Sequence, residues 1–346
     1  MRRKARLVLL ATVLAWAGAC TSFSGSGDST PPDTNEGGTD APAPPPPAAD
    51  SGADVVSPKC GDPLATPSKF AFPATPPDSI ATDGAFLYWT SNAGKQLGRA
   101  PLAGGAAIET LLTGATASLS RLTFTSDDIL WKNADHLYWA PKTDVVDGGL
   151  PDGSASYLTD SVGDVVALGA EIVYVRGGDG MYHGTPGEAF GSLLGPSTAR
   201  ALSGLGPRVV FIAPDVDAGS SSIFSIDDVH KVIGKPRFVA HDDGGAPAVL
   251  AADGQSIFYA TDAADAVYSV PVAGGEPQIV ANGQSGISAI VLDGDDLFFA
   301  STSGIARVAK TGGCIEPITG LAASSFVIIA PWLYAIQAAS IVRVPR

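Results

Sequence analysis

Four histidines and one run of acids are the residues of this sequence best suited to bind a metal ion or to transfer a proton. His136, His183, His230 and His241 show none of the short spacings by which histidines share a zinc ion. Segment 215–219 reads Asp-Val-Asp-Ala-Gly and has the alternating acids of a calcium loop, but it lacks the third acid and the distal glutamate of such a loop. We therefore expect no metal and no cofactor, and we interpret these side chains as packed residues and acidic turns.

Patterns for nucleophilic catalysis and phosphate binding are also missing. Ser192 and Ser220, which each follow a glycine, do not stand in the Gly-x-Ser-x-Gly pattern of a hydrolase elbow. The glycine-rich segment 177–180 reads as a hairpin, because no helix follows it to bind a phosphate. The sequence shows no catalytic constellation, and we expect a protein that is not an enzyme.

The overall charge is strongly acidic. The 346 residues contain 35 Asp and Glu against 21 Lys and Arg, which gives a net charge of −14 at pH 7. A surface of this sign repels nucleic acid and anionic lipid headgroups, so we exclude those partners. The hydrophobic content of 45% supports a large core, and 41 glycines with 27 prolines favour a fold with many turns.

Residues 1–19 have the parts of a signal peptide. A basic start precedes the apolar run 7–19, which as a helix would span about 20 Å and is too short for a bilayer core of about 30 Å. The run ends in Ala17-Gly18-Ala19-Cys20, which resembles the bacterial lipoprotein signal. The resemblance implies an exported chain that is lipidated on Cys20, and Thr21 in place of an aspartate favours the outer membrane, facing the periplasm or the cell surface. The ordinary signal-peptidase pattern is the alternative, because lipoprotein signals usually have Leu where Ala17 stands.

Residues 20–58 predict a disordered tether rather than a folded unit. After Cys20 this segment has six acids, no base and the proline run 44–47, with almost no apolar periodicity. Such a composition cannot bury enough apolar surface to offset the entropy of ordering the chain. We therefore expect the lipid anchor to be its only contact with the membrane, and the folded domain to occupy residues 59–346.

The folded part repeats one unit seven times. The second predicted strand of each copy contains a run of three apolar residues. The middle residues of successive runs are 35 to 48 residues apart. This period is that of a four-stranded propeller blade. The middle residues of the seven runs are Tyr88, Leu130, Tyr174, Phe211, Tyr259, Phe299 and Tyr334.

The best-preserved copy, residues 79–114, predicts four strands separated by Asp-Gly and Gly-Gly turns. The last copy lacks a fourth strand, and Lys69–Phe72 near the N-terminus can supply it. The predicted fold is therefore all-β: a seven-bladed β-propeller of four-stranded antiparallel blades whose last blade is closed by an N-terminal strand. Six or eight blades are the alternatives, because the third and fourth copies are degenerate.

The repeats resemble those of the YWTD-type propellers and of the looser TolB-like group of secreted propellers. The residues that carry the resemblance are Tyr88-Trp89-Thr90-Ser91, Tyr259-Ala260-Thr261-Asp262 and the Arg-Ala-Pro-Leu-Ala-Gly-Gly run from Arg99. No copy has the full Tyr-Trp-Thr-Asp motif, and YWTD domains usually have six blades. The resemblance implies a binding or scaffold domain.

The two remaining cysteines are brought together by the ring. Cys314 begins the outer strand of the sixth copy, and Cys60 precedes the N-terminal strand that completes the seventh. Both strands begin at the same end of adjacent blades, and an exported protein can keep a disulfide. We therefore expect a bond between Cys60 and Cys314, with two unpaired thiols as the alternative.

The loops that join second to third strands are the candidate binding surface, because they vary most between copies. The candidate residues in them are Asn92, Lys95, Asn133, Asp135, Asp179, Asp215, Asp217, Asp262, Asp265 and Gln337. We expect a monomeric, non-enzymatic binding or scaffold module with a protein or glycan partner in the cell envelope. The alternatives are an exported hydrolase or dehydrogenase with a metal in the central channel, and an envelope spacer with no ligand.

Overall fold

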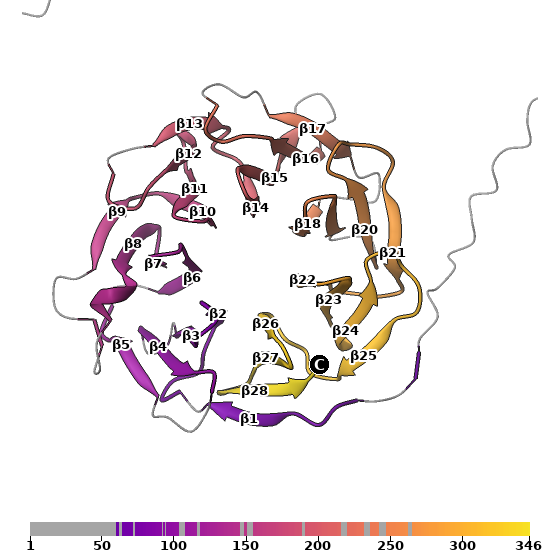
Figure 1. Ribbon diagram of the computed structural model, residues 1–346, viewed down its shortest axis with the longest axis horizontal. Helices are drawn as coiled ribbons and strands as arrows, with labels where there is room; N and C mark the ends of the chain where they lie inside the picture. The colour runs from indigo at the N-terminus through magenta and orange to yellow at the C-terminus, as the bar shows by residue number, and fades with distance from the viewer. Residues whose placement is uncertain are drawn as a thin grey trace, which may run out of the picture. The chain divides into compact units, whose positions relative to one another are not determined.

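The computed structural model describes residues 60–61, 64–71, 73–91, 93, 95–103, 108–115, 118–145, 149–150, 155–188, 191–215, 220–231, 236–241, 247–261 and 265–346. Within these residues, 28 strands form seven four-stranded antiparallel sheets arranged as the blades of a ring (Figure 1). The seven-bladed propeller predicted from the sequence is confirmed, and the counts of six and eight are wrong. The predicted signal peptide and tether lie outside the described residues.

Each blade is numbered by its order in the chain, and its strands are given from the channel outward. Blade 1 contains β2 (Ser79–Thr82), β3 (Phe86–Ser91), β4 (Gln96–Pro101) and β5 (Glu109–Leu112); blade 2 contains β6 (Leu119–Phe124), β7 (Asp128–Asn133), β8 (His136–Pro141) and β9 (Ser156–Thr159); blade 3 contains β10 (Val162–Leu168), β11 (Glu171–Arg176), β12 (Gly180–Gly184) and β13 (Ser192–Gly195).

The remaining four blades follow the same order. Blade 4 contains β14 (Arg200–Leu205), β15 (Arg208–Asp215), β16 (Ser220–Ile226) and β17 (Arg237–His241); blade 5 contains β18 (Pro247–Ala252), β19 (Ser256–Thr261), β20 (Ala266–Pro271) and β21 (Gln278–Asn282); blade 6 contains β22 (Ala289–Asp293), β23 (Asp296–Ser301), β24 (Gly304–Ala309) and β25 (Glu316–Thr319); blade 7 contains β26 (Phe326–Ile329), β27 (Trp332–Gln337), β28 (Ser340–Pro345) and β1 (Ser68–Ala71).

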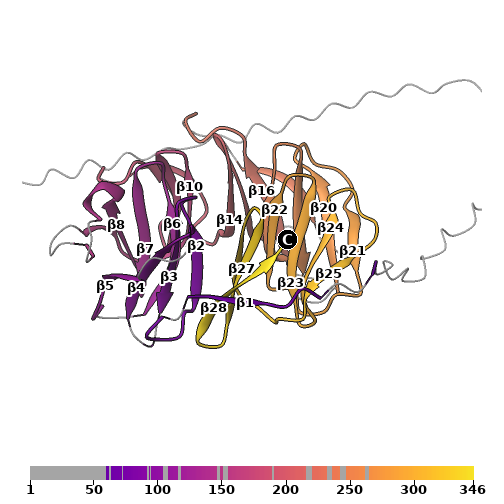
Figure 2. The same cartoon turned by 60° about the horizontal axis from the view of Figure 1, so that its bottom comes forward.

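Blade 7 joins the two ends of the folded domain. The N-terminal strand β1 pairs antiparallel with β28 and lies along the outside of the ring (Figure 2). Cys60 forms a disulfide with Cys314, as expected, with the two Cα atoms 5.5 Å apart. The backbone N–H of Cys60 also donates to the carbonyl of Ile315 at 2.9 Å. The closing strand is therefore bonded to blade 7 by its ladder and to blade 6 by the disulfide.

The core lies in the seams between blades. Seven clusters of buried residues occur among the described residues, one at each seam. Tyr88 packs toward blade 2 and its neighbour Trp89 packs toward blade 7, because successive side chains of a strand point to opposite faces. These two aromatic residues are almost fully buried, so they serve the ring and not recognition.

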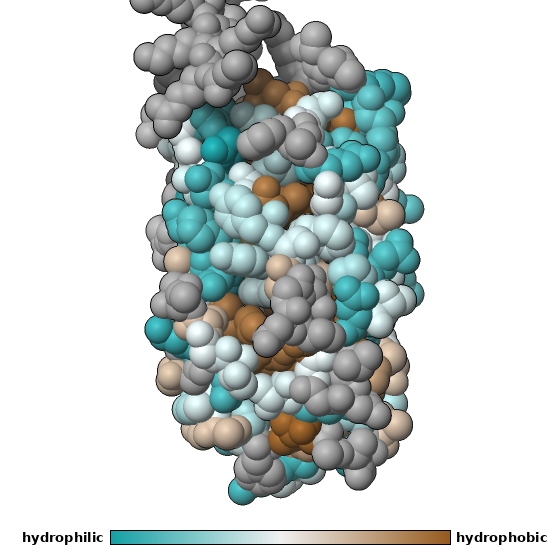
Figure 3. All heavy atoms as spheres, turned by 90° about the vertical axis from the view of Figure 1, so that its left-hand side faces the viewer, coloured by the Kyte–Doolittle hydropathy of each residue, from teal (hydrophilic) through white to brown (hydrophobic). Residues whose placement is uncertain are grey.

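The outer rim carries isolated apolar side chains. Ile108, Tyr157 and Leu193 lie on or beside the outer strands and are exposed. Seen from the side, the hydrophobic patches are separated by hydrophilic ones (Figure 3). The described residues contain one short 3₁₀ helix, η1 (Lys142–Asp144), and no helix with the length and apolar character needed to cross a bilayer.

Candidate functional site

The loops between second and third strands open on the face of the ring where the first strands begin. In blade 1, Ser79 at the start of β2 pairs with Thr90 near the end of β3. We call this face, with the loop at Lys95, the mouth face. The opposite face, with the turns between first and second and between third and fourth strands, is the base face.

Three of the predicted binding residues hold the next blade in place through their backbones. The carbonyl of Lys95 accepts the N–H of Ala115 at 3.2 Å, and the carbonyl of Asp135 accepts the N–H of Val162 at 2.7 Å. The carbonyl of Asp265 accepts the N–H of Gln284 at 2.8 Å. Each bond joins a mouth-face loop to the segment that leads into the following blade, so these loop positions have a repeated structural role.

The other predicted residues lie on separate blades. Asp179 forms an ion pair with Arg176 at 3.0 Å, and the carbonyl of Gln337 accepts the hydroxyl of Ser340 at 3.1 Å. Asn133 pairs with His136 across the β7–β8 turn. The candidates that lie outside the described residues are Asn92, Asp217, Asp262 and, for lipidation, Cys20. The described candidates come from different blades, and the contacts given above do not bring them together at one ligand group.

A hollow of about 290 Å³ lies at the centre of the mouth face, between the first strands. Most of its lining is apolar or hydroxyl-bearing, as expected for these strands. The lining includes Arg121, Leu202, Val249, Ile290, Ser288 and Ser325. The hollow is large enough for an end group or one side chain rather than for a large ligand.

Arg121 is the charged side chain in the lining of this hollow, and a β-bulge directs it there. The bulge lies between Ser120 and Leu122, and Arg121 has a φ of 45°, which is uncommon for a residue with a side chain. The Nη2 atom of Arg121 lies 2.5 Å from Oδ1 of Asp164 in blade 3, with side-chain exposures of 52% and 6%. Asp164 is buried and paired, whereas the guanidinium stays open to the hollow.

A second cation lies beside this pair. Lys132 is opposite Ser120 in the β6–β7 ladder, and its Nζ donates to the carbonyl of Gly163 at 3.0 Å. Burial holds the pKa of Lys132 below its ordinary value; Asp164 opposes this effect and Arg121 adds to it. Asp164 also accepts the N–H of Leu202 through Oδ2 at 3.1 Å, which links blade 3 to blade 4. Two cations therefore surround one carboxylate in a protein whose net charge is negative.

The sequence interpretation missed Arg121 and Asp164 because it began the first strands too late. Apolar alternation alone marks Leu122–Thr125 and Val165–Leu168 as the first strands of these copies, whereas β6 begins at Leu119 and β10 at Val162. Both strands are bulged, and bulges break the alternation from which the expected strands were drawn. The available signal was a charged residue placed just before an apolar strand in two successive copies.

One cluster in blade 4 has the residue types of a catalytic triad but not its geometry. The Oγ atom of Ser222 lies 2.7 Å from Nδ1 of His241 and donates to Oδ2 of Asp215 at 3.3 Å. The same Nδ1 atom lies 3.6 Å from Oδ2 of Asp215. In a triad the serine and the acid contact different ring nitrogens, and here both face one nitrogen. Ser222 is also fully buried, so we interpret the cluster as a structural network.

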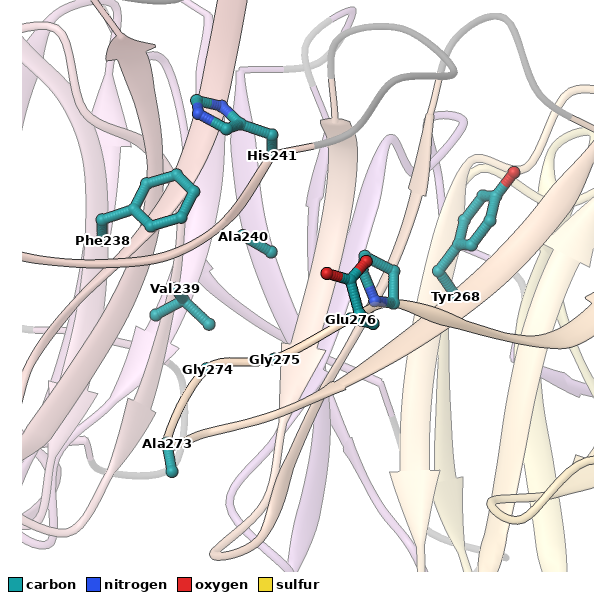
Figure 4. A pocket seen from close by; sticks show the side chains of 10 residues that line it. Phe238, Val239, Ala240, His241, Tyr268, Ala273, Gly274, Gly275 and Glu276 are labelled. Carbon is teal, nitrogen blue, oxygen red and sulfur yellow. The ribbon is translucent and has the colours of Figure 1, made fainter. Parts of the chain in front are cut away.

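A lateral groove of about 750 Å³ lies outside the channel, between blades 4 and 5. Figure 4 shows Glu276 between the Phe238–His241 pair and Tyr268. The rings of Phe238 and His241 lie 4.5 Å apart and contact each other. Glu276 is exposed, and it makes no ion pair with the described residues. The groove offers one carboxylate and the rings of Phe238, His241 and Tyr268, and it shows no strained side chain directed into it.

Glu171, His183 and His230 could hold a metal ion, and the sequence spacing did not reveal them. Their ligand atoms all lie within 4.8 Å of one another, at the seam between blades 3 and 4 on the base face. Burial alone would raise the pKa of Glu171, but the two histidines hold it below its ordinary value. Glu171 raises the pKa of His230, and Asp228 adds to that effect. His183 is the buried member of the group.

Comparison with solved structures shows the fold. YCF48 in complex with the D1 peptide is 10% identical, with a TM-score of 0.61, and the match covers 86% of this chain and 99% of that one. The Pan2 WD40 domain of Neurospora crassa is 10% identical, with a TM-score of 0.60 and coverages of 83% and 97%. Virginiamycin B lyase of Staphylococcus aureus is 14% identical, with a TM-score of 0.55 and coverages of 81% and 98%.

No family model and no curated protein matches the sequence. The structural neighbours share one architecture but differ from one another in function. At such low identity they establish the propeller fold alone. Assignment of this chain to the YWTD type stays a prediction.

Proposed function

We propose that this chain is an exported, non-enzymatic binding module of the cell envelope, and that its mouth-face hollow receives a carboxylate of a partner protein. The observation that supports this function best is the bulge that directs Arg121 into the hollow. A non-glycine residue at positive φ inside a strand has a conformational cost, and of the two such residues that line the hollow, Arg121 and Ala201, Arg121 is the one that brings a charge there.

The chemistry of the hollow favours an acidic end group. A guanidinium presents several N–H donors in a plane and binds carboxylates in pairs of hydrogen bonds. Asp164 contacts one edge of Arg121, and the half-exposed remainder faces the hollow. Lys132 adds a second cation beside the pair.

The residues on the channel wall favour binding over the alternative of a channel metalloenzyme. Such an enzyme needs several acids, amides or imidazoles that converge from the first strands. Among the described first strands the carboxylates are Asp164 and Asp293, which lie near opposite ends of the channel. Asp293 forms an ion pair with Arg346 at the base face.

A polypeptide partner is favoured by a structural neighbour as well as by the chemistry. The YCF48 propeller, which has the same overall architecture, was solved with a bound peptide. A peptide C-terminus or an acidic side chain fits the small volume of the hollow, while the neighbouring mouth-face loops would contact the rest of the segment. A neutral glycan would leave the charge of Arg121 unused.

Peptide capture tests the proposal. The immobilised full-length chain is exposed to a pool of nine-residue peptides with free C-termini, to the same pool amidated, and to an amidated pool rich in Asp and Glu. We expect capture of the free or acidic peptides to exceed capture of neutral amidated peptides by about tenfold, the size of one charge-assisted contact. Arg121→Gln should abolish this preference. Arg121→Lys should weaken it, because an ammonium lacks the paired, coplanar N–H donors of a guanidinium.

The groove variant Glu276→Gln is the matched control and should keep the preference. Equal capture of charged and neutral peptides, or full capture by Arg121→Gln, would show that the hollow is not the site. Capture of glycans from envelope extract by all variants would favour the glycan partner. Metabolic labelling with a fatty acid tests the anchor: the label should be present in the wild type and absent in Cys20→Ala.

A further inference from the structure

Two histidines and a glutamate converge at a seam that the proposed peptide site does not use. Glu171 begins β11 and His183 lies in β12, both in blade 3, whereas His230 lies after β16 in blade 4. The Oε2 atom of Glu171 is 2.7 Å from Nε2 of His230 and 3.1 Å from Nε2 of His183. The two imidazole rings are perpendicular, with centroids 5.1 Å apart. Residues far apart in sequence thus direct three donor atoms to one point.

The orientation of His230 is set by a second carboxylate. Asp228 Oδ1 lies 3.2 Å from Nδ1 of His230 and accepts its backbone N–H at 3.0 Å. A proton on Nδ1 leaves the lone pair of Nε2 directed at the oxygen of Glu171. Without a metal ion, Nε2 carries a proton instead and donates it to Glu171 at 2.7 Å, so a bound metal ion would take the place of that proton. Carboxylates in this position commonly orient the histidines that bind metal.

His183 supplies an independent observation. Its side chain is 90% buried, and Nε2 makes no hydrogen bond of acceptable geometry with the described residues, although Glu171 lies 3.1 Å away. A buried nitrogen without a partner carries a free-energy cost of about 1–3 kcal/mol. The same nitrogen is directed at the point where Glu171 and His230 meet, so one bound cation would satisfy it.

We propose that Glu171, His183 and His230 bind one divalent transition-metal ion of the zinc type at the seam between blades 3 and 4. Two imidazoles and one carboxylate form a ligand set suited to zinc, cobalt or nickel. Tetrahedral bonds of about 2.0–2.1 Å place ligand atoms about 3.3 Å apart, close to the observed 2.7 and 3.1 Å, so small side-chain movements open the site.

The ion would act as a cross-link between blades rather than as a catalyst of the channel. Its ligands come from two blades, and the buried cluster of Val173, Val209 and Val229 packs at the same seam. Glu171 and His230 are partly exposed, so water can occupy the fourth position. The site lies on the base face, on the opposite face from the hollow at Arg121, and the inference does not rest on the peptide-binding proposal.

Cobalt and zinc titrations test the site on the untagged full-length chain after treatment with a chelator. We expect one Co²⁺ per chain with the visible absorption of a four- or five-coordinate ion, displacement of Co²⁺ by Zn²⁺, and a rise in the thermal midpoint on adding Zn²⁺. His230→Ala should remove all three signals and should fold, because His230 is exposed. Asp228→Asn should weaken binding about tenfold, as expected for a carboxylate that orients a ligand.

His136→Ala is the matched control. His136 is a half-exposed histidine beside an aspartate, 3.5 Å from Asp135, but no described histidine or glutamate converges on it. This variant should bind Co²⁺ as the wild type does. Absence of stoichiometric Co²⁺ in the wild type, or binding that persists in His230→Ala, would overturn the proposal.

Discussion

At the residue scale, Gly98 shows how closely the seams are packed. A Cβ atom added at Gly98 would lie 2.6 Å from Cε2 and Cζ2 of Trp89, whose indole covers the glycine in the neighbouring strand. The indole is held by blade 7 on its other side, at Tyr334 and Ile341, so it has no room to move away. A single methyl group therefore cannot be accommodated without a shift of the seam.

Gly98→Ala should lower the free energy of unfolding by about 1–3 kcal/mol, the usual cost of overpacking. Urea unfolding followed by tryptophan fluorescence measures the change. Gly254→Ala is the control, because a Cβ at Gly254 meets nothing within 4 Å. We expect the control to change stability by less than about 0.5 kcal/mol. Equal effects of the two substitutions would contradict the role given to Trp89.

Asp253 illustrates why the turns carry aspartate. Its Oδ1 atom accepts the backbone N–H groups of Gln255 and Ser256, both at 2.9 Å, and its Oδ2 atom lies 2.7 Å from Nζ of Lys310 in blade 6. Burial alone would raise the pKa of Asp253, but Lys310 and the two N–H donors hold it below its ordinary value. One carboxylate therefore shapes its own turn and joins two blades.

The lowered pKa of Asp253 predicts a pH dependence of stability. A carboxyl group with a lower pKa in the folded than in the unfolded state stabilises above the unfolded pKa of about 3.9, and its contribution is lost as the pH falls through the folded pKa. Asp253→Asn should cost about 1 kcal/mol at pH 7, a modest value because the side chain is partly exposed. The difference from the wild type should shrink below about pH 4.

Urea midpoints at pH 7 and at pH 3 measure this difference. The control is Asp295→Asn, whose carboxyl is exposed, and it should leave the midpoint unchanged at both pH values. A cost at Asp253 that is equal at the two pH values would contradict the assignment to its charge.

At the element scale, β1 closes the ring and is held by its ladder with β28 and by one covalent bond. The strand is short, and its register with β28 shifts between Lys69 and Ala71. Ala65 adds one backbone bond to Ile318 at 3.0 Å, and the disulfide of Cys60 holds the approach to the strand. Without the disulfide, only a few backbone hydrogen bonds would keep β1 from fraying.

The double variant Cys60→Ser/Cys314→Ser should lose up to about 5 kcal/mol of stability, the chain-entropy figure for a loop of this length. The bond spans 254 residues, so it removes much of the freedom of the unfolded chain. Limited proteolysis under native conditions should cut near β1 in the variant and not in the oxidised wild type. Unchanged unfolding and unchanged cleavage would show that the β1–β28 ladder alone closes the ring.

The elements themselves were largely predictable from the sequence, and their bulges were not. The four strands predicted for residues 79–114 correspond to β2 to β5, because apolar alternation and Asp-Gly turns set them locally. The ion pair of Arg121 joins it to a residue of another blade, Asp164, and no local pattern contains that information. The histidines at the base face were missed for the same reason, since His183 and His230 meet only across a seam.

At the scale of the whole molecule, the ring places the two proposed sites on opposite faces. The hollow at Arg121 opens on the mouth face, and the metal cluster at His230 lies on the base face. Substitutions at distant sites without shared partners act independently. Arg121→Gln should therefore leave Co²⁺ affinity unchanged within a factor of about two, and His230→Ala should leave peptide capture unchanged.

The same titration and capture assays measure this independence, with the double variant showing the sum of the two losses. A change in metal affinity in Arg121→Gln would mean that the two faces are coupled through blade 3, which supplies Asp164 to one site and Glu171 to the other.

The disulfide also determines how a pulling force on the N-terminus would travel through the protein. Any load that arrives at residue 60 passes through the sulfur bond to Cys314, at the base-face end of blade 6. The hydrogen bonds between β1 and β28 then carry little of the tension and are not opened one by one. A pulling force on an anchored chain would therefore reach the body of the ring at the base face, opposite the mouth face at Arg121. The closing strand β1 would carry little of that force.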